Sequence, residues 1–290
     1  MKKAHLAALT LLAAACAGDL PPRSVLQDLR VLALLSTPLE AGPDETVTVQ
    51  AIRVPPAGAT IAQEQWSFCP FTVGATASDV CAVPQCETPL EPVGGVVTAD
   101  PGALALACLQ QFSTAGTGAP SGLPSQVPSR LEVIFRYRVQ ASDNSSREAV
   151  LRVPFYPGGV PIDRNARPKV TSIAFGGQPV SLVSPPDGPV AVQLPVPKGS
   201  QLELRVTLDP SSVQRYQDSS GRAVDEQLFV SFFTTAGRFD FDRGVGLDEH
   251  VQLKDEKVPQ GVSSAQVYAV AHDDRGGATV LGPYQVDFVR

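Results

Sequence analysis

The chain has 290 residues, with 29 acidic against 23 basic side chains and a formal net charge of −6 at pH 7. An acidic surface repels phosphate backbones and anionic lipids, so this balance argues against a nucleic-acid partner. A hydrophobic content of 43% argues against a disordered protein. The 27 prolines and 24 glycines indicate many turns, as in an all-β protein.

The first 16 residues have the pattern of an export signal. Lys2 and Lys3 precede an apolar run over residues 4–15, and small residues lead up to Cys16. This run is too short to cross a bilayer as a helix, but it has the length of the apolar region of a signal peptide. We therefore expect cleavage of residues 1–15, which leaves a short tether over residues 16–27.

With Cys16 at the cleavage point, the segment resembles a bacterial lipoprotein signal with its lipobox. The resemblance implies acyl chains, palmitate among them, on Cys16 and tethering to a membrane. That family usually has Leu three places before the cysteine, where this chain has Ala13. Ala17 follows the cysteine in place of Asp, which in that family implies the outer membrane. An ordinary cleaved signal is the alternative, but five cysteines favour the lipoprotein because removal of Cys16 leaves an even number.

Apolar and polar residues alternate along most of the remaining chain, as in residues 201–208. A period of two predicts strands with one buried and one solvated face, which belong to antiparallel sheets. In the first half, strands are expected at 29–35, 46–54, 64–68, 131–141 and 148–155. In the second half, they are expected at 170–175, 201–208, 226–233, 265–272 and 278–289.

The order of strands and turns repeats, and this repeat predicts the fold class: all-β, with two tandem Ig-like antiparallel β-sandwiches. We place the first sandwich at residues 28–157 and the second at residues 169–290. Residues 158–168 between them are rich in Pro and Gly, which is typical of a linker.

Short motifs resemble bacterial Ig-like and PKD-like modules. Residues 229–239 are similar to their central strand and turn, and residues 270–277 to their last hairpin. Trp66 occupies the place where these modules carry a tryptophan, and the opening at residues 29–34 resembles lipoproteins common in myxobacteria. Such modules serve adhesion, spacing and ligand binding, so the resemblance implies a fold and a cell-envelope location but no single function.

A long segment at about residues 69–128 interrupts the first repeat and carries four cysteines. In an oxidising compartment these should form two disulfides, for which three pairings exist. We favour Cys81 with Cys86 and Cys69 with Cys108, because nested bridges would staple the segment to the central strand. A zinc site is the alternative, but Cys-x4-Cys is an unusual ligand spacing and no histidine is near in the sequence.

The same segment also predicts a short helix. Asp100 followed by Pro101 is typical of a helix N-cap and first turn. The apolar residues that follow share one helical face: Leu104, Ala105, Cys108, Leu109 and Phe112.

Candidate chemistry is sparse. His272 beside Asp273 and Asp274 invites an acid–base interpretation, but no nucleophile elbow, zinc-protease motif or phosphate-binding loop accompanies it, and a hairpin shoulder explains it better. Four acidic residues could supply oxygen ligands for calcium, although their spacing does not match an EF-hand: Asp240, Asp242, Asp248 and Glu249. No motif for any other cofactor occurs.

These observations predict a lipid-anchored cell-envelope protein of the outer membrane that is not an enzyme. Its expected role is a non-catalytic binding or adhesion module. It would contact the membrane through Cys16, and an envelope protein or a glycan through the cysteine-bearing segment and the loops. A structural subunit of an envelope assembly is the alternative, and a hydrolase that uses His272 is a third hypothesis.

Overall fold

In the computed structural model, residues 23–72, 80–114, 128–218, 220–256 and 258–289 are described, with the side chains of residues 112–114 left out. Cys16 and the expected signal lie outside these ranges. Within them, no helix is both long enough and apolar enough to span a membrane.

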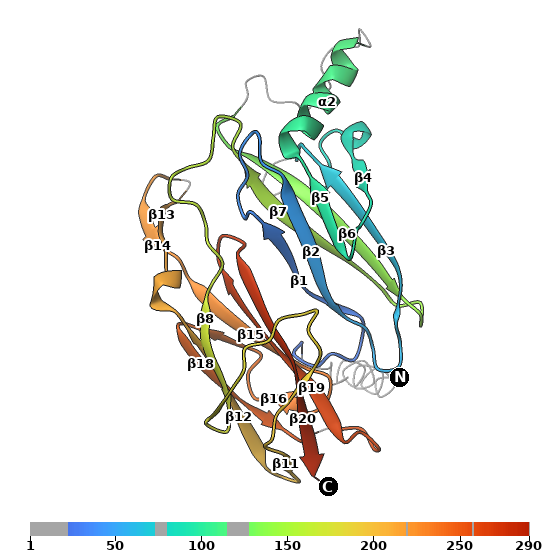
Figure 1. The fold of residues 1–290 in the computed structure, drawn as a ribbon, viewed down its shortest axis with the longest axis vertical. Coiled ribbons are helices and arrows are strands. Elements are labelled where there is room, and N and C mark those ends of the chain that lie inside the picture. Colours follow the sequence, from blue (N-terminus) through green and yellow to red (C-terminus); the bar gives the residue numbers. More distant parts are fainter. Residues whose placement is uncertain (1–22, 73–79, 115–127, 219, 257, 290) are drawn as a thin grey trace, which may run out of the picture.

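The first half of the chain forms two antiparallel sheets that face each other (Figure 1). One sheet has the order β1-β2-β5, with β1 at Arg30–Thr37, β2 at Val47–Val54 and β5 at Val96–Ala99. The other has the order β4-β3-β6-β7, with β4 at Thr88–Leu90, β3 at Ile61–Cys69, β6 at Leu131–Ala141 and β7 at Ser146–Phe155.

The second half repeats this plan with extra short strands. One sheet has the order β9-β8-β12-β18-β16: Gln178–Val180, Val170–Phe175, Gln201–Leu208, Asp248–Lys254 and Arg238–Phe239. The other has the order β10-β20-β19-β15-β17: Val190–Ala191, Ala278–Val289, Ser264–Asp273, Leu228–Thr234 and Arg243–Val245. β11 (Val196–Pro197) also pairs with β20, and β13 (Arg215–Gln217) and β14 (Ala223–Asp225) form a separate hairpin.

Both halves therefore place their main strands in the same spatial order, since β8-β12-β18 corresponds to β1-β2-β5 and β17-β15-β19-β20 to β4-β3-β6-β7. The prediction of an all-β, Ig-like sandwich fold is confirmed, and the strands expected at 131–141, 170–175, 201–208 and 278–289 have the predicted bounds. The division of the chain into folding units at 28–157 and 169–290 stays a prediction.

Each pair of sheets encloses its own hydrophobic core. The first core contains Trp66, which is 4% exposed, with its ring centroid 4.4 Å from that of Tyr137. In the second core, Phe232 and Tyr284 are completely buried. Alternation along the strands produces these cores: in β12, Leu202, Leu204, Val206 and Leu208 are buried while the residues between them are partly or fully exposed.

The two sandwiches pack against each other through the outer faces of two sheets. β1 and β2 of the first sandwich present Leu32, Leu35 and Ile52, which contact Val270 and Val280 on β19 and β20 of the second. Val54, Tyr268 and Phe233 continue this apolar contact. Because the interface is apolar and buried, it fixes the orientation of one sandwich relative to the other.

The segment before β1 is part of this interface, which corrects the expectation of a tether over residues 16–27. Ser24, Val25 and Leu26 are buried, and Val25 pairs in parallel with Thr234 at the end of β15. Two backbone hydrogen bonds of 2.8 Å hold it there, from Leu26 to Thr234 and from Thr234 to Ser24. A free tether in this structure extends at most to residue 23.

The cysteine-bearing segment at 69–128 is also not simply an insertion, since β4 and β5 within it complete the two sheets of the first sandwich. The favoured disulfide pairing is wrong. Cys69 pairs with Cys81, and Cys86 pairs with Cys108, so each bridge joins two cysteines that are consecutive along the segment. The four thiols are thereby used, and the zinc alternative is wrong as well.

Local backbone geometry explains the observed pairing. Shortly after β3, Thr72 pairs in antiparallel fashion with Cys81, which places Cys81 beside Cys69. The 3-10 turn η2 (Pro84–Cys86) then directs Cys86 towards the following helix.

The expected helix is confirmed as α2 (Pro101–Thr114). The Asp100 carboxylate accepts a 2.9 Å hydrogen bond from the backbone N–H of Ala103, which is the N-cap contact that the sequence predicts. Ala105 and Cys108 are buried, but Leu109 is exposed, and the side chain of Phe112 lies outside the described set. The apolar face is thus narrower than the sequence suggests.

We expect the Cys86–Cys108 bridge to hold α2 on the first sandwich. The bridge lies in a small cluster with Phe71, Val83 and Ala105, and outside this cluster the helix packs on the first core through the partly buried Leu104. The double variant Cys86→Ser/Cys108→Ser should therefore lose about 2–4 kcal/mol of stability in urea unfolding. Proteolysis should cut it first near α2, and an unchanged cleavage pattern would show that packing alone holds the helix.

Candidate functional site

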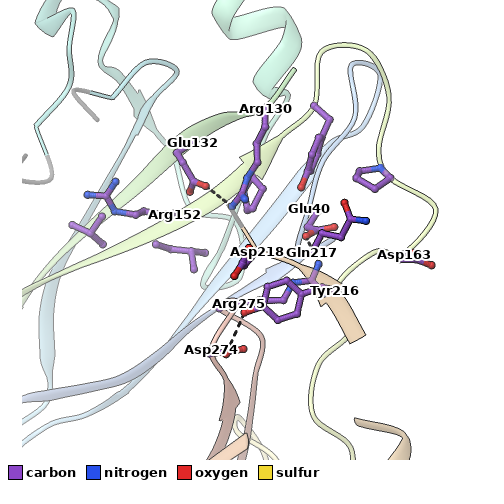
Figure 2. Close-up of a pocket in the computed structure, with 16 residues that line it drawn as sticks. Glu40, Arg130, Glu132, Arg152, Asp163, Tyr216, Gln217, Asp218, Asp274 and Arg275 are labelled. Atoms are coloured by element: carbon purple, nitrogen blue, oxygen red, sulfur yellow. Dashed lines mark hydrogen bonds and ion pairs between the residues drawn. The ribbon is translucent and has the colours of Figure 1, made fainter. Parts of the chain in front are cut away.

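A polar cleft of about 750 Å³ lies where the two sandwiches meet on the side of the β13–β14 hairpin (Figures 1 and 2). Six segments of the chain build it. The first sandwich contributes Glu40, the start of β6 and the end of β7, and the second contributes β13 and the β19–β20 turn, with residues 161–163 crossing between them. In Figure 2, Arg130 and Glu132 of the first sandwich lie above Tyr216 and Arg275 of the second.

Backbone pairing explains why these segments converge. After β1, Ala41 pairs in parallel with Phe155, and the Tyr156 N–H donates a 2.9 Å hydrogen bond to the Ala41 carbonyl oxygen. This contact sets Glu40 beside Tyr156 at the end of β7. On the opposite wall, the Asp273 carboxylate accepts hydrogen bonds from the backbone N–H groups of Arg275 (2.8 Å) and Gly277 (2.7 Å), and so fixes the turn that carries Arg275.

Arg275 lies at the base of the cleft and joins the two sandwiches. It forms ion pairs with Glu40 of the first sandwich at 2.8 Å and with Glu226, just before β15, at 3.0 Å. The Glu226 side chain is fully buried, that of Glu40 is 5% exposed and that of Arg275 is 15% exposed. We call Glu40, Glu226 and Arg275 the joint triad.

Further hydrogen bonds hold the joint triad in place. The backbone N–H of Asn165 donates to Glu40 at 3.2 Å, and that of Gln214 donates to Glu226 at 3.3 Å. Asn165 belongs to the expected linker, so this connection is fixed to both sandwiches. The cleft is therefore largely pre-formed, as ligand sites usually are.

Burial shifts the pKa of the acids in and beside the joint triad. Desolvation, together with the nearby charge of Asp273, raises the pKa of Glu226. Desolvation also raises the pKa of Asp273, although backbone hydrogen bonds from Gly277 and Arg275 oppose it. Burial alone would lower the pKa of Arg275, but hydrogen bonds and charge from Glu40 and Glu226 raise it, so this side chain stays cationic.

These shifts give stability a definite pH dependence. A carboxyl group whose pKa is raised by folding binds its proton more tightly in the folded state, so stability rises as pH falls from the raised pKa towards the ordinary value of about 4. We expect the variant Glu226→Gln to flatten the slope of unfolding free energy against pH in this window. Asp187→Asn, at an exposed turn, is the control; an equal slope in Glu226→Gln and wild type would contradict the assignment.

Two tyrosines line the cleft, one from each sandwich. The ring of Tyr216 rests on Arg275, whose guanidinium carbon is 4.9 Å from the ring centre, and its hydroxyl lies 3.4 Å from Asp274 (Figure 2). Tyr156, which directly follows β7, also lines the cleft, and burial together with the charge of Glu40 raises the pKa of its hydroxyl. At the rim, Arg130 forms an ion pair with Glu132 at 2.6 Å.

His272 does not line this cleft. Its ring stacks on Phe229 with centroids 5.2 Å apart, and its Nε2 atom lies 3.5 Å from the hydroxyl of Ser231. Desolvation lowers its pKa. Asp273 holds the turn and Asp274 contacts Tyr216, so in the described structure the neighbouring acids do not serve His272 as the acid–base hypothesis requires.

The calcium candidates do not assemble into a site. Asp248 forms an ion pair with Arg205, and Asp240 accepts hydrogen bonds from the backbone N–H groups of Phe241 and Gln252. Within the described ranges, no group of three or more His, Cys, Asp or Glu side chains could hold a metal ion. The proposed set of Asp240, Asp242, Asp248 and Glu249 is therefore wrong.

The sequence prediction missed the cleft, because its residues are scattered between positions 40 and 276 and carry no motif. The sequence does contain one indication of the contact between the two sandwiches, which forms the cleft. Residues 31–35 and 267–271 are continuously apolar, whereas a strand with one wet face alternates. Such runs indicate strands covered on both faces.

No protein family matches this chain, and no curated protein matches it. Among solved structures it is similar to the D00-D0 domain of intimin, with 13% identity and a TM-score of 0.24, over 91% of this chain and 99% of that one. Fibronectin(III)-like modules of Clostridium thermocellum CbhA match at 9% identity and a TM-score of 0.24, over 88% and 93%. A Bacteroides ovatus glucan-utilization protein, SGBP-B, solved with a mixed-linkage heptasaccharide, matches at 10% identity and a TM-score of 0.18, over 90% and 70%. TM-scores this low support no argument about function, so the fold class here rests on the strand order.

Proposed function

We propose that the protein is a lipid-anchored, non-catalytic binding module of the bacterial outer membrane that holds its ligand in the cleft between the sandwiches. The main support for this proposal is the cleft itself. Both sandwiches contribute its walls, and the joint triad and the apolar interface keep those walls in place without a ligand. A site that is already formed loses little entropy on binding.

The composition of the cleft supports binding without catalysis. Its lining, which lies within the described residues, contains no histidine, cysteine or serine. Two of its carboxylates already have arginine partners, Glu132 with Arg130 and Glu40 with Arg275. Groups held in this way suit recognition better than nucleophilic attack or proton transfer.

The position of the N-terminal segment supports an anchor that leaves the cleft accessible. Val25 is bound at Thr234, the last residue of β15, whereas Glu226 of the joint triad lies two residues before the start of β15. Seven residues of strand separate the two points by about 23 Å. A chain tethered through Cys16 would therefore enter the interface at the end of β15 remote from the cleft.

Mass spectrometry of the protein extracted from membranes tests the anchor. We expect an N-terminal Cys16 carrying acyl chains, and we expect Cys16→Ser to move the protein into the soluble envelope fraction. A wild-type chain that keeps Met1, or that carries an unmodified Cys16, would refute the anchor.

Retention on the insoluble envelope fraction of the host bacterium tests the cleft. The soluble Cys16→Ser chain should be retained. Adding both Arg130→Ala and Tyr216→Ala to that chain should abolish its retention. Phe241→Ala, which removes an aromatic ring that is 68% exposed and lies outside the cleft, is the matched control. Equal retention of all three proteins would refute the cleft as the binding site.

A further inference from the structure

Most of the charged side chains that line the cleft are ion-paired within the protein, which limits the class of ligand. Arg130 is paired with Glu132, Arg275 with Glu40, and Asp218 with Arg222 at 3.3 Å. An anionic ligand would have to compete with the carboxylate of one of these pairs. A hydroxyl group can instead donate to a carboxylate and accept from a guanidinium while the pair stays intact, because each group has more hydrogen-bonding positions than its partner uses.

The walls of the cleft add aromatic surface to this polar rim. The two tyrosines come from different sandwiches, Tyr156 from the end of β7 and Tyr216 from β13. Arg275 beneath one face of Tyr216 limits movement of that ring, so the ring offers a fixed surface. A tyrosine combines an apolar ring with a polar hydroxyl, and so it suits ligands that alternate C–H faces with hydroxyl edges.

We propose that the cleft binds an uncharged oligosaccharide, with sugar rings against Tyr156 and Tyr216 and sugar hydroxyls on the paired Arg and carboxylate groups. This inference rests on the proposed binding function and names its ligand class. The acidic excess of the chain, 29 acidic against 23 basic side chains, disfavours anionic glycans. The volume of about 750 Å³ lies within the range of sites that bind small molecules.

Calorimetric titration of the soluble Cys16→Ser chain tests the proposal. The probes are cellohexaose, maltohexaose and chitohexaose as neutral oligosaccharides, with an oligogalacturonate of equal length as the anionic comparison. We expect at least one neutral probe to bind and the anionic one not to bind. Tyr216→Ala should weaken that binding about tenfold, Tyr216→Phe less, and Phe241→Ala not at all.

Circular dichroism of each variant separates loss of binding from loss of folding. Absence of binding by all three neutral probes, or equal binding by wild type and Tyr216→Ala, would overturn the inference. If envelope retention still depends on Tyr216 in that case, the ligand class is wrong while the proposed function stands. If retention is also independent of the cleft, the proposed function itself is wrong.

Discussion

Replacement of Arg275 by Met should destabilise the protein by about 3–5 kcal/mol in denaturant unfolding at pH 8. The substitution leaves Glu40 and Glu226 buried with no counter-charge, and Glu226 is fully buried. Burial already raises the pKa of Glu226 with Arg275 present. The loss should therefore be smaller at pH 5, because protonation of Glu226 removes one of the two uncompensated charges.

Two further variants separate this cause from lost packing under Tyr216. The triple variant Glu40→Gln/Glu226→Gln/Arg275→Met removes all three charges and should recover most of the lost stability. Arg222→Met removes an ion pair whose arginine is 77% exposed and should change stability by less than about 0.5 kcal/mol. If the triple variant is as unstable as Arg275→Met, then packing and not charge accounts for the effect.

The strands could be predicted from the sequence because each carries its own signal. Alternation in residues 131–141 and 201–208 records which face meets a core, and this depends only on neighbours along the strand. The N-cap at Asp100 is local in the same way. The repeat of the strand order then identified the sandwich fold, because few arrangements bury such strands.

The disulfides and the cleft could not be predicted in this way, because they depend on distances between segments. Four cysteines allow three pairings, and the pairing of Thr72 with Cys81, which selects the observed one, leaves no mark in the sequence. The strands β4 and β5 were missed because they have only three and four residues, too few to show a period. Glu40 and Arg275 are 235 positions apart, and nothing near either residue indicates the other.

The apolar interface gives the second large effect, and Val270→Asp is the variant that tests it. Val270 is 4% exposed and packs against Ile52 and Val280, outside the core of its own sandwich. Its neighbours Ala269 and Ala271 face that core, so the change places an unpaired carboxylate between the sandwiches but leaves the core side chains unaltered. We expect the free energy of unfolding to fall by about 3 kcal/mol or more, because the contact between the sandwiches is weakened.

Small-angle scattering should therefore show a larger radius of gyration for Val270→Asp, while circular dichroism keeps its β-sheet signal. Because both sandwiches supply walls of the cleft, envelope retention should fall with the increase in radius. Val289→Asp, at a half-exposed position at the end of β20, should match wild type in both measurements. A compact Val270→Asp variant that is still retained would mean that the joint triad alone holds the walls together, and that the apolar contact is dispensable for the site.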